Sequence, residues 1–305
     1  MIVLLPYFGP FPSTWPLTLR SMERNVGIDW MIFSDQEIPS HQAANVSFCR
    51  TSLVELQDRF SKRLGFDVQL PHPYKLCDFK PAYGELFEKE IESYDYWGYC
   101  DADVVFGDLA SQISGALSVG PEKIFRRGHL SFVRNTPEAN SRYRVACSGL
   151  PDYRTVFQDE TNHAFDEIGG MYERYERLGI HVYENDQLFD IGPDRFRVKA
   201  NSAGPVEKYY VYRDGRMLAV DGGSRRVREG RYIHLQKRAY ADLPEGWDSA
   251  TMLAFAPSKL YAVRSIEEAV SAIRHEERSL QERFRWFGRY ARRRVRGLQK
   301  RFRRQ

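Results

Sequence analysis

Two aspartates one residue apart are the residues whose spacing points most directly to chemistry. Asp101 and Asp103 follow YWGYC, an apolar run that reads as a buried strand, and VVF follows them. Two carboxylates this close repel each other unless a cation neutralises them. Their hard oxygen atoms, in a chain whose cysteines form no CxxC pair, suit Mg²⁺ or Mn²⁺. A bare D-x-D is also common in solvated or capped loops, so its surroundings must decide.

The elements before these aspartates predict where they lie. Strand and helix patterns alternate over the first 65 residues. Strand patterns occur at 2–9, 29–35 and 45–50, and helical patterns at about 14–25 and 53–63. This alternation predicts a parallel α/β sheet. Ligands of such sheets bind at the carboxyl ends of the strands, which is where Asp101 and Asp103 are expected.

The following residues extend this pattern to about residue 265. Asp78 reads as the N-cap of a helix with Pro81 in its first turn. Further predicted elements are two short strands within 123–134, a helix capped by Thr136 and a hairpin turning at Asp214 and Gly215. We therefore predict one domain at 1–265 and a helical tail at 266–305.

Several segments in order resemble a known family. YWGYCDADVVFGDL resembles the DxD motif of GT-A glycosyltransferases. The series LLPYFG, DFKPAYG, DADVVFGDL, GHLSFVRNT, HAFDEIGGM and HLQKR is similar to a bacterial glycosyltransferase-like family linked to surface polysaccharide synthesis. The similarity covers about residues 2–261. It implies a GT-A-like α/β fold, with a mixed, mostly parallel sheet flanked by helices and a basic C-terminal helix outside it.

The resemblance implies an enzyme that transfers a sugar, with a hexose expected. The donor would be a nucleotide-sugar, a UDP-sugar being favoured, and the acceptor a carbohydrate or a lipid-linked glycan. The departing diphosphate gains negative charge, which Mn²⁺ or Mg²⁺ and a lysine would stabilise.

The resemblance and the residue types together assign roles to individual residues. The expected metal ligands are Asp101, Asp103 and His234. The expected donor-binding residues are Tyr7, Asp35, Asp78, Lys80, Asp101, Arg126 and Lys237. The expected acceptor or sugar contacts are His129 and His163. The catalytic candidates are Asp166 and Glu167, because an acceptor hydroxyl loses a proton during inverting transfer.

Simpler interpretations of some of these residues stay open. Glu167 also reads as an acid on a helix surface, so Asp166 is the preferred catalytic residue. His234 also fits a hydrogen-bonded core histidine, and Arg126 a solvated sheet edge.

Two other functions also stay open. A haloacid-dehalogenase-type phosphatase carries a D-x-D-x-[T/V] motif, in which Asp101 would be the nucleophile and Asp103 the general acid. That motif normally opens its domain, whereas about 100 residues of strand and helix pattern precede it here. The second alternative is a non-enzymatic protein that binds polyanions through its tail.

Positive charge is concentrated at the C-terminus. Residues 278–305 hold twelve Lys and Arg and one acid, about +11, so the other 277 residues carry about −7 of the net +4. The acidic body disfavours nucleic acid as the partner. The larger apolar residues of the tail recur at helical spacing: Leu280, Phe284, Phe287, Ala291, Val295, Leu298 and Phe302.

An amphipathic basic helix of this kind is typical of a membrane interface, although a helix packed on the body has the same stripe. The four cysteines read as reduced residues of a cytosolic protein. We expect a cytoplasmic protein that associates peripherally with anionic lipid at the inner face of the cell membrane.

Overall fold

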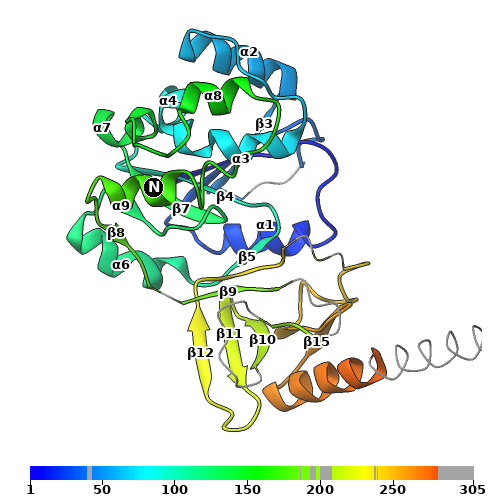
Figure 1. Cartoon of the computed structure of the whole chain (residues 1–305). Coiled ribbons are helices and arrows are strands. Elements are labelled where there is room, and N and C mark those ends of the chain that lie inside the picture. The colour runs from blue at the N-terminus through cyan, green and yellow to red at the C-terminus, as the bar shows by residue number, and fades with distance from the viewer. Residues whose placement is uncertain are drawn as a thin grey trace, which may run out of the picture. The chain divides into compact units, whose positions relative to one another are not determined.

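The computed structural model describes residues 1–39, 43–185, 187–192, 197–199, 208–236, 238 and 240–280. The chain forms two compact units, the first spanning Met1–Leu188 and the second beginning at Phe189 (Figure 1). The predicted boundary at residue 265 stays a prediction, and the tail beyond residue 280 lies outside the described residues. Among the helices described, none is both long and apolar enough to cross a bilayer.

The first unit is built on a seven-stranded sheet with the order β3-β2-β1-β4-β7-β6-β8. Its strands are β1 (Ile2–Pro6), β2 (Asp29–Ser34), β3 (Val46–Arg50), β4 (Tyr96–Cys100), β6 (Lys123–Ile124), β7 (Leu130–Arg134) and β8 (Val182–Tyr183). Strands β1 to β4 run parallel, and β7 is antiparallel to β4 and β6. The predicted mixed, mostly parallel α/β sheet is confirmed.

Helices flank both faces of this sheet, with α2, α4 and α8 on one side and α1 on the other (Figure 1). The helices are α1 (Trp15–Glu23), α2 (Leu53–Leu64), α3 (Leu76–Phe79), α4 (Tyr83–Leu86), α5 (Glu88–Ile91), α6 (Leu109–Val119), α7 (Pro137–Asn140), α8 (Tyr153–Gln158) and α9 (Met171–Arg177). A short strand, β5 (Val104–Phe106), follows the two aspartates and packs on α1. Short 3₁₀ turns are η1 (Pro73–Lys75), η2 (Lys80–Ala82) and η3 (Arg142–Arg144).

Capping residues explain some helix boundaries and correct one prediction. Thr136 caps α7 as predicted, because its side chain accepts a hydrogen bond from the Ala139 amide. The prediction that Asp78 is an N-cap was wrong, since Asp78 lies inside α3, whose N-cap is Lys75. The Asp78 carboxylate instead accepts bonds from a distant loop, described below.

The second unit contains a five-stranded antiparallel sheet with the order β12-β11-β10-β14-β15. Its strands are β10 (Lys208–Arg213), β11 (Arg216–Asp221), β12 (Val227–Gly230), β14 (Met252–Phe255) and β15 (Leu260–Val263). The hairpin predicted at Asp214 and Gly215 is confirmed. Two further strands, β9 (Leu188–Asp190) and β13 (Tyr232–His234), pair with each other. Residues 266–280 are helical, and Ala269, Val270 and Ile273 of this helix join the core of the sheet.

Strand β4 carries the two aspartates and is buried along its whole length. Its central residue, Gly98, pairs with Phe132 of the antiparallel strand β7. A Cβ atom at Gly98 would lie 2.5 Å from the Ser131 carbonyl oxygen and 2.8 Å from the Phe132 ring. The glycine therefore allows the close packing of β7 that fixes the end of β4.

Substitution of Gly98 by alanine should lower the free energy of unfolding by about 3 kcal/mol, because the nearest obstructing atom belongs to the backbone and cannot rotate away. Urea denaturation measures the change. Gly27→Ala is the matched control, since a Cβ there meets nothing within 4 Å, and we expect a change within about 0.5 kcal/mol. Equal losses in the two variants would contradict this account of β4.

Candidate active site

A buried lysine connects three segments of the first unit. The Lys80 ammonium donates to Asp101 Oδ1 at 2.6 Å and to the Gly128 carbonyl at 3.0 Å. Asp166 Oδ2 lies 3.2 Å from the same nitrogen. Lys80 is 5% exposed and Asp166 4% exposed. One cation therefore holds together the η2 turn, the end of β4 and the loop before α9; we call Lys80, Asp101 and Asp166 the Lys80 cluster.

The Lys80 cluster contains one positive charge and two carboxylates, and Lys80 does not stabilise the two carboxylates equally. Burial by itself lowers the pKa of Lys80, but the charges of Asp101 and Asp166 raise this pKa well above its ordinary value. Burial raises the pKa of Asp166 to about 6, and the Lys80 charge only partly offsets that effect. Lys80 and Asp101 form the short ion pair, so Asp166 is the carboxylate whose burial is less well compensated.

The carboxyl ends of three parallel strands meet at one edge of the sheet. Tyr7 follows β1, Asp35 follows β2, and Asp101 follows β4. The strand order reverses between β1 and β4, because β2 and β3 lie on one side of β1 and β4 on the other. This reversal point is where open α/β sheets bind their ligands. The sequence-based expectation that Asp101 and Asp103 follow a buried strand of such a sheet is confirmed.

Tyr7 lies at the same edge and forms part of an aromatic row. Its ring stacks on Phe11 with centroids 5.0 Å apart, and Phe11 stacks on Trp15 at 4.1 Å. Burial, and then the charge of Asp103, raise the pKa of the Tyr7 hydroxyl. The influence of Asp103 places its carboxylate in the neighbourhood of Tyr7, so an aromatic surface and an acid lie together beyond β1.

Asp35 is exposed at the end of β2, and its hydrogen bonds fix the loop after β1. Its Oδ1 accepts from the Gly9 amide at 3.0 Å and from Gln36 Nε2 at 2.8 Å. The bond from Gln36 and then the bond from Gly9 lower the pKa of Asp35. An ionised acceptor therefore lies beside Gly9, in the loop that follows β1.

Asp78 serves the loop that carries Asp166. Its carboxylate is fully buried, pairs with the Lys75 ammonium at 2.8 Å, and accepts from the amides of His163 and Phe165 at 3.0 and 2.9 Å. These bonds position residues 163–165, directly before Asp166. The predicted contact of Asp78 with a donor stays a prediction, and the geometry favours a positioning role for this residue.

Glu167 and Gly128 complete the wall around Asp166. The Glu167 carboxylate accepts a bond from the Gly128 amide at 2.9 Å, while the Gly128 carbonyl accepts from Lys80. A side chain at Gly128 would collide with the Asp166 carboxylate. His129, next in the chain, is buried. Glu167 bonds to Gly128, and His129 follows Gly128 in the chain. Both residues therefore lie next to the segment that accepts a hydrogen bond from Lys80.

Two predicted site residues have other partners in the first unit. Arg126 pairs with Glu176 at 3.0 Å and stacks over the Tyr172 ring. His163 Nε2 lies 2.8 Å from Asp159. Their proposed contacts with donor and acceptor stay predictions.

In the second unit, His234 ends β13 beside an aspartate that the sequence analysis missed. His234 Nδ1 lies 2.9 Å from Asp190 Oδ1, which also accepts from Gln236 Nε2 at 2.7 Å. A carboxylate on one ring nitrogen fixes the tautomer and orients the other nitrogen, as in many metal-binding histidines. Whether His234 shares an ion with Asp101 and Asp103 stays a prediction, and Lys237 lies outside the described residues.

Two residues of the first unit were also missed. Lys75 neutralises Asp78 and donates to the Val156 and Thr161 carbonyls. Burial raises the pKa of Cys77 to about 12, so its thiol stays neutral beside the Lys80 cluster. Asp190 had a detectable signal, because it ends the apolar run LFD as Asp35 ends its own strand. Lys75 and Cys77 had none.

The raised pKa of Asp166 predicts how stability changes with pH. The folded-state pKa of about 6 lies above the ordinary 3.8, so the folded state binds this proton more tightly than the unfolded chain. The contribution of Asp166 to stability therefore falls as pH rises from about 4 to 6. Relative to wild type, Asp166→Asn should gain about 2 kcal/mol between pH 4 and pH 7.

Urea denaturation of both proteins at pH 4, 5, 6 and 7 measures this difference, in which all other titrating groups cancel. A difference that stays constant with pH would show that Asp166 titrates normally. A difference of opposite sign would show that Lys80, not burial, dominates the ionisation of Asp166.

Two solved structures of sugar transferases are similar to this chain over about two thirds of its length. Among solved structures, the chain is similar to galactosyltransferase LgtC in complex with donor and acceptor sugar analogs, with a TM-score of 0.38 and 10% identity over 64% of this chain and 77% of that one. It is also similar to mouse xyloside xylosyltransferase 1, with a TM-score of 0.38 and 9% identity over 63% of this chain and 88% of that one.

A search of curated proteins gave no significant match. The model of a family of unknown function, DUF6625, matches residues 3–260. This match spans most of both compact units, and the chain therefore belongs to the DUF6625 family.

Proposed function

We propose that this chain is a metal-dependent, GT-A-like glycosyltransferase, which moves a sugar from a nucleotide-sugar to a carbohydrate or lipid-linked acceptor. One observation carries the proposal. The D-x-D pair lies at the carboxyl end of β4, next to the point where the strand order reverses, and a buried lysine pairs with its first aspartate. A site that binds a diphosphate through a divalent ion needs acidic ligands and positive charge together at such an edge.

The donor nucleotide would occupy the edge formed by β1, β2 and β4. The Tyr7 and Phe11 rings offer a surface on which a base can stack, and the ionised Asp35 can accept a hydrogen bond from a base or a ribose. We favour a UDP-sugar with a hexosyl group. The Lys80 charge would stabilise the diphosphate as it departs.

Asp101 and Asp103 fit a hard divalent ion because both offer carboxylate oxygens in a setting without thiolate ligands. Asp103 is the first choice for direct binding, since Asp101 Oδ1 already accepts from Lys80 at 2.6 Å. His234, oriented by Asp190, is the proposed third ligand, through a neutral imidazole. Bound Mn²⁺ or Mg²⁺ would supply positive charge for the leaving diphosphate.

Asp166 is the proposed base toward the acceptor. Burial raises its pKa to about 6, close to the pH at which a general base works best. Glu167 supports it by fixing the Gly128 amide, and His129 and His163 are the proposed contacts to sugar hydroxyls. The charge of Lys80, which lies 3.2 Å from Asp166, favours the ionised carboxylate and partly offsets the effect of burial.

The cellular setting is part of the same proposal. A role in surface polysaccharide synthesis would need access to lipid-linked acceptors. The basic tail would supply it by attaching the enzyme to anionic lipid at the inner face of the cell membrane.

The metal assignment predicts a selective loss of ligand binding. UDP should raise the melting temperature of wild-type protein only when Mn²⁺ is present, because a ligand of the folded state stabilises it by mass action. Asp103→Asn keeps the shape of the side chain but removes its charge, and this increase should disappear. Asp58→Asn, an exposed site on α2, is the charge-matched control and should respond as wild type does. Equal responses of all three proteins would reject Asp103 as a metal ligand.

The base assignment predicts a separation of two measurements. Asp166→Asn should reduce the rate of sugar transfer by about 100-fold or more, within the range of general-base catalysis. Its Kd for the donor with Mn²⁺ should stay within about threefold of wild type. Calorimetry and a transfer assay measure the two effects. Comparable losses of binding and rate would mean that Asp166 positions the donor through Lys80.

A further inference from the structure

The second unit contains a basic cavity that the proposed transferase site does not use. Its volume is about 310 Å³, near the lower end for small-molecule sites. Its lining residues are Arg225, Glu267, Val270, Ser271, Arg274, His275 and Arg278. Six of these lie at helical spacing on one face of the helix at 266–280, and Arg225 comes from the turn between β11 and β12.

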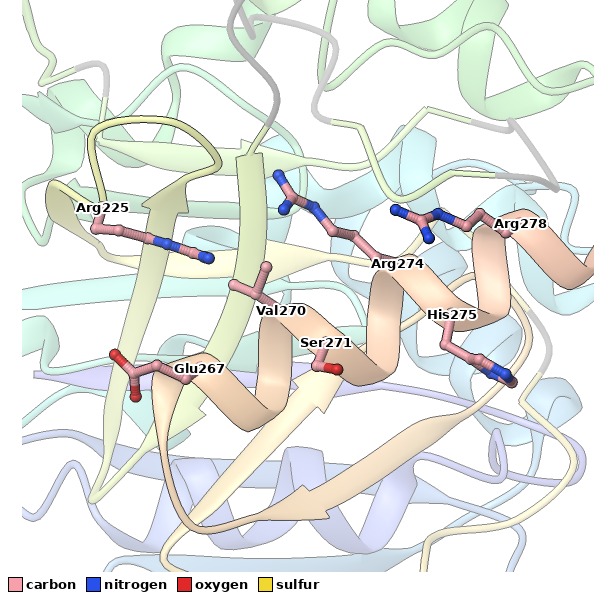
Figure 2. Close-up of a pocket in the computed structure, with 7 residues that line it drawn as sticks. All are labelled: Arg225, Glu267, Val270, Ser271, Arg274, His275 and Arg278. Carbon is pink, nitrogen blue, oxygen red and sulfur yellow. The ribbon is translucent and has the colours of Figure 1, made fainter.

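Three guanidinium groups dominate this cavity. Figure 2 shows those of Arg274 and Arg278 directed to the same side of the helix, with Arg225 reaching across from the hairpin turn. Glu267 is the single carboxylate in the lining, so three arginines face one acid. The cavity therefore carries a net positive charge.

Packing fixes one of these arginines before any ligand binds. Arg274 Nε donates to the Tyr209 hydroxyl at 2.6 Å, and its Nη2 donates to the Gly222 carbonyl at 3.3 Å. Its guanidinium also lies over the Tyr209 ring, 5.3 Å from the centroid. A preorganised arginine loses less side-chain entropy when it binds an anion.

Arg225 has a strained backbone. Its φ angle is +58°, a region that favours glycine or asparagine over a long side chain. The turn is held by a bond from the Arg225 amide to the Asp221 carbonyl at 3.1 Å and another from the Asp221 amide to the Arg226 carbonyl at 2.9 Å. Such strain is found at binding sites, where the gain in function offsets its cost.

We propose that this cavity, formed by Arg225, Arg274 and Arg278, is a phosphate-binding site separate from the transferase site. Guanidinium forks match the geometry of phosphate oxygens and bind them with paired, charge-assisted hydrogen bonds. The ligand is a phosphate or diphosphate group, borne either by a lipid headgroup or by a soluble molecule. The sequence after Arg278 is strongly basic, so positive charge continues along the chain from this site.

Four variants of the full-length chain test the proposal, with inorganic pyrophosphate as the soluble probe. Calorimetry is done with EDTA present, so that metal-dependent binding at the donor site does not contribute. Arg278→Gln and Arg225→Asn should each weaken binding by about tenfold, because each removes charge-assisted bonds. Glu267→Gln should tighten binding, because it removes the repelling charge.

Two of these variants distinguish binding in the cavity from nonspecific attraction of the anion to positive charge. Arg226→Gln is the matched control, since Arg226 is the exposed neighbour of Arg225 and does not line the cavity; its affinity should stay within about twofold of wild type. Arg225→Asn relieves the positive-φ strain, so its melting temperature should equal or exceed that of wild type while affinity falls.

Vesicles of phosphatidylcholine with phosphatidic acid distinguish the two sources of phosphate. If the pocket variants weaken vesicle binding more than Arg226→Gln does, the ligand is a lipid headgroup. If only pyrophosphate binding responds, the ligand is soluble. The proposal is wrong if wild type binds neither probe, or if the pocket variants match the Arg226→Gln control with both.

Discussion

The buried Lys80 ammonium is the interaction on which the candidate site depends. It pairs with Asp101 from β4 and lies 3.2 Å from Asp166 of the loop before α9. Without Lys80, the Asp101 and Asp166 carboxylates would lose their shared cation, and breaking a buried ion pair in this way typically costs about 3–5 kcal/mol. Lys80 therefore links the aspartate at the end of β4 to the loop that carries Asp166.

Two further features of the first unit hold that cation in place. Gly98 lets β7 pack closely on β4, which fixes the strand end that carries Asp101. The buried Lys75–Asp78 pair holds the amides of His163 and Phe165, and so places Asp166 against Lys80. The Lys75–Asp78 pair therefore positions the loop. The Lys80 cluster, in which one cation faces two carboxylates, is the part that we assign to the chemistry.

Features that depend on neighbouring residues can be predicted from the sequence, whereas contacts between distant segments cannot. Acids at strand ends, such as Asp35 and Asp101, follow from apolar runs in an alternating chain, and Thr136 follows from its neighbouring proline. Asp78 was misassigned as a cap because the amides that donate to it lie 85 and 87 positions away. Lys80 was predicted as a donor contact, but its pairing with Asp166 requires the folded chain. Asp190 was detectable as a strand-end acid and was overlooked.

The most direct test of the central claim is anomalous diffraction from crystals grown with Mn²⁺ and a UDP-sugar. We expect a manganese peak at the carboxyl ends of β1 and β4, where Asp103 and a diphosphate oxygen bind the ion and the base packs against Tyr7 or Phe11. A manganese and nucleotide site on other elements, or manganese bound to these aspartates without the diphosphate, would contradict it.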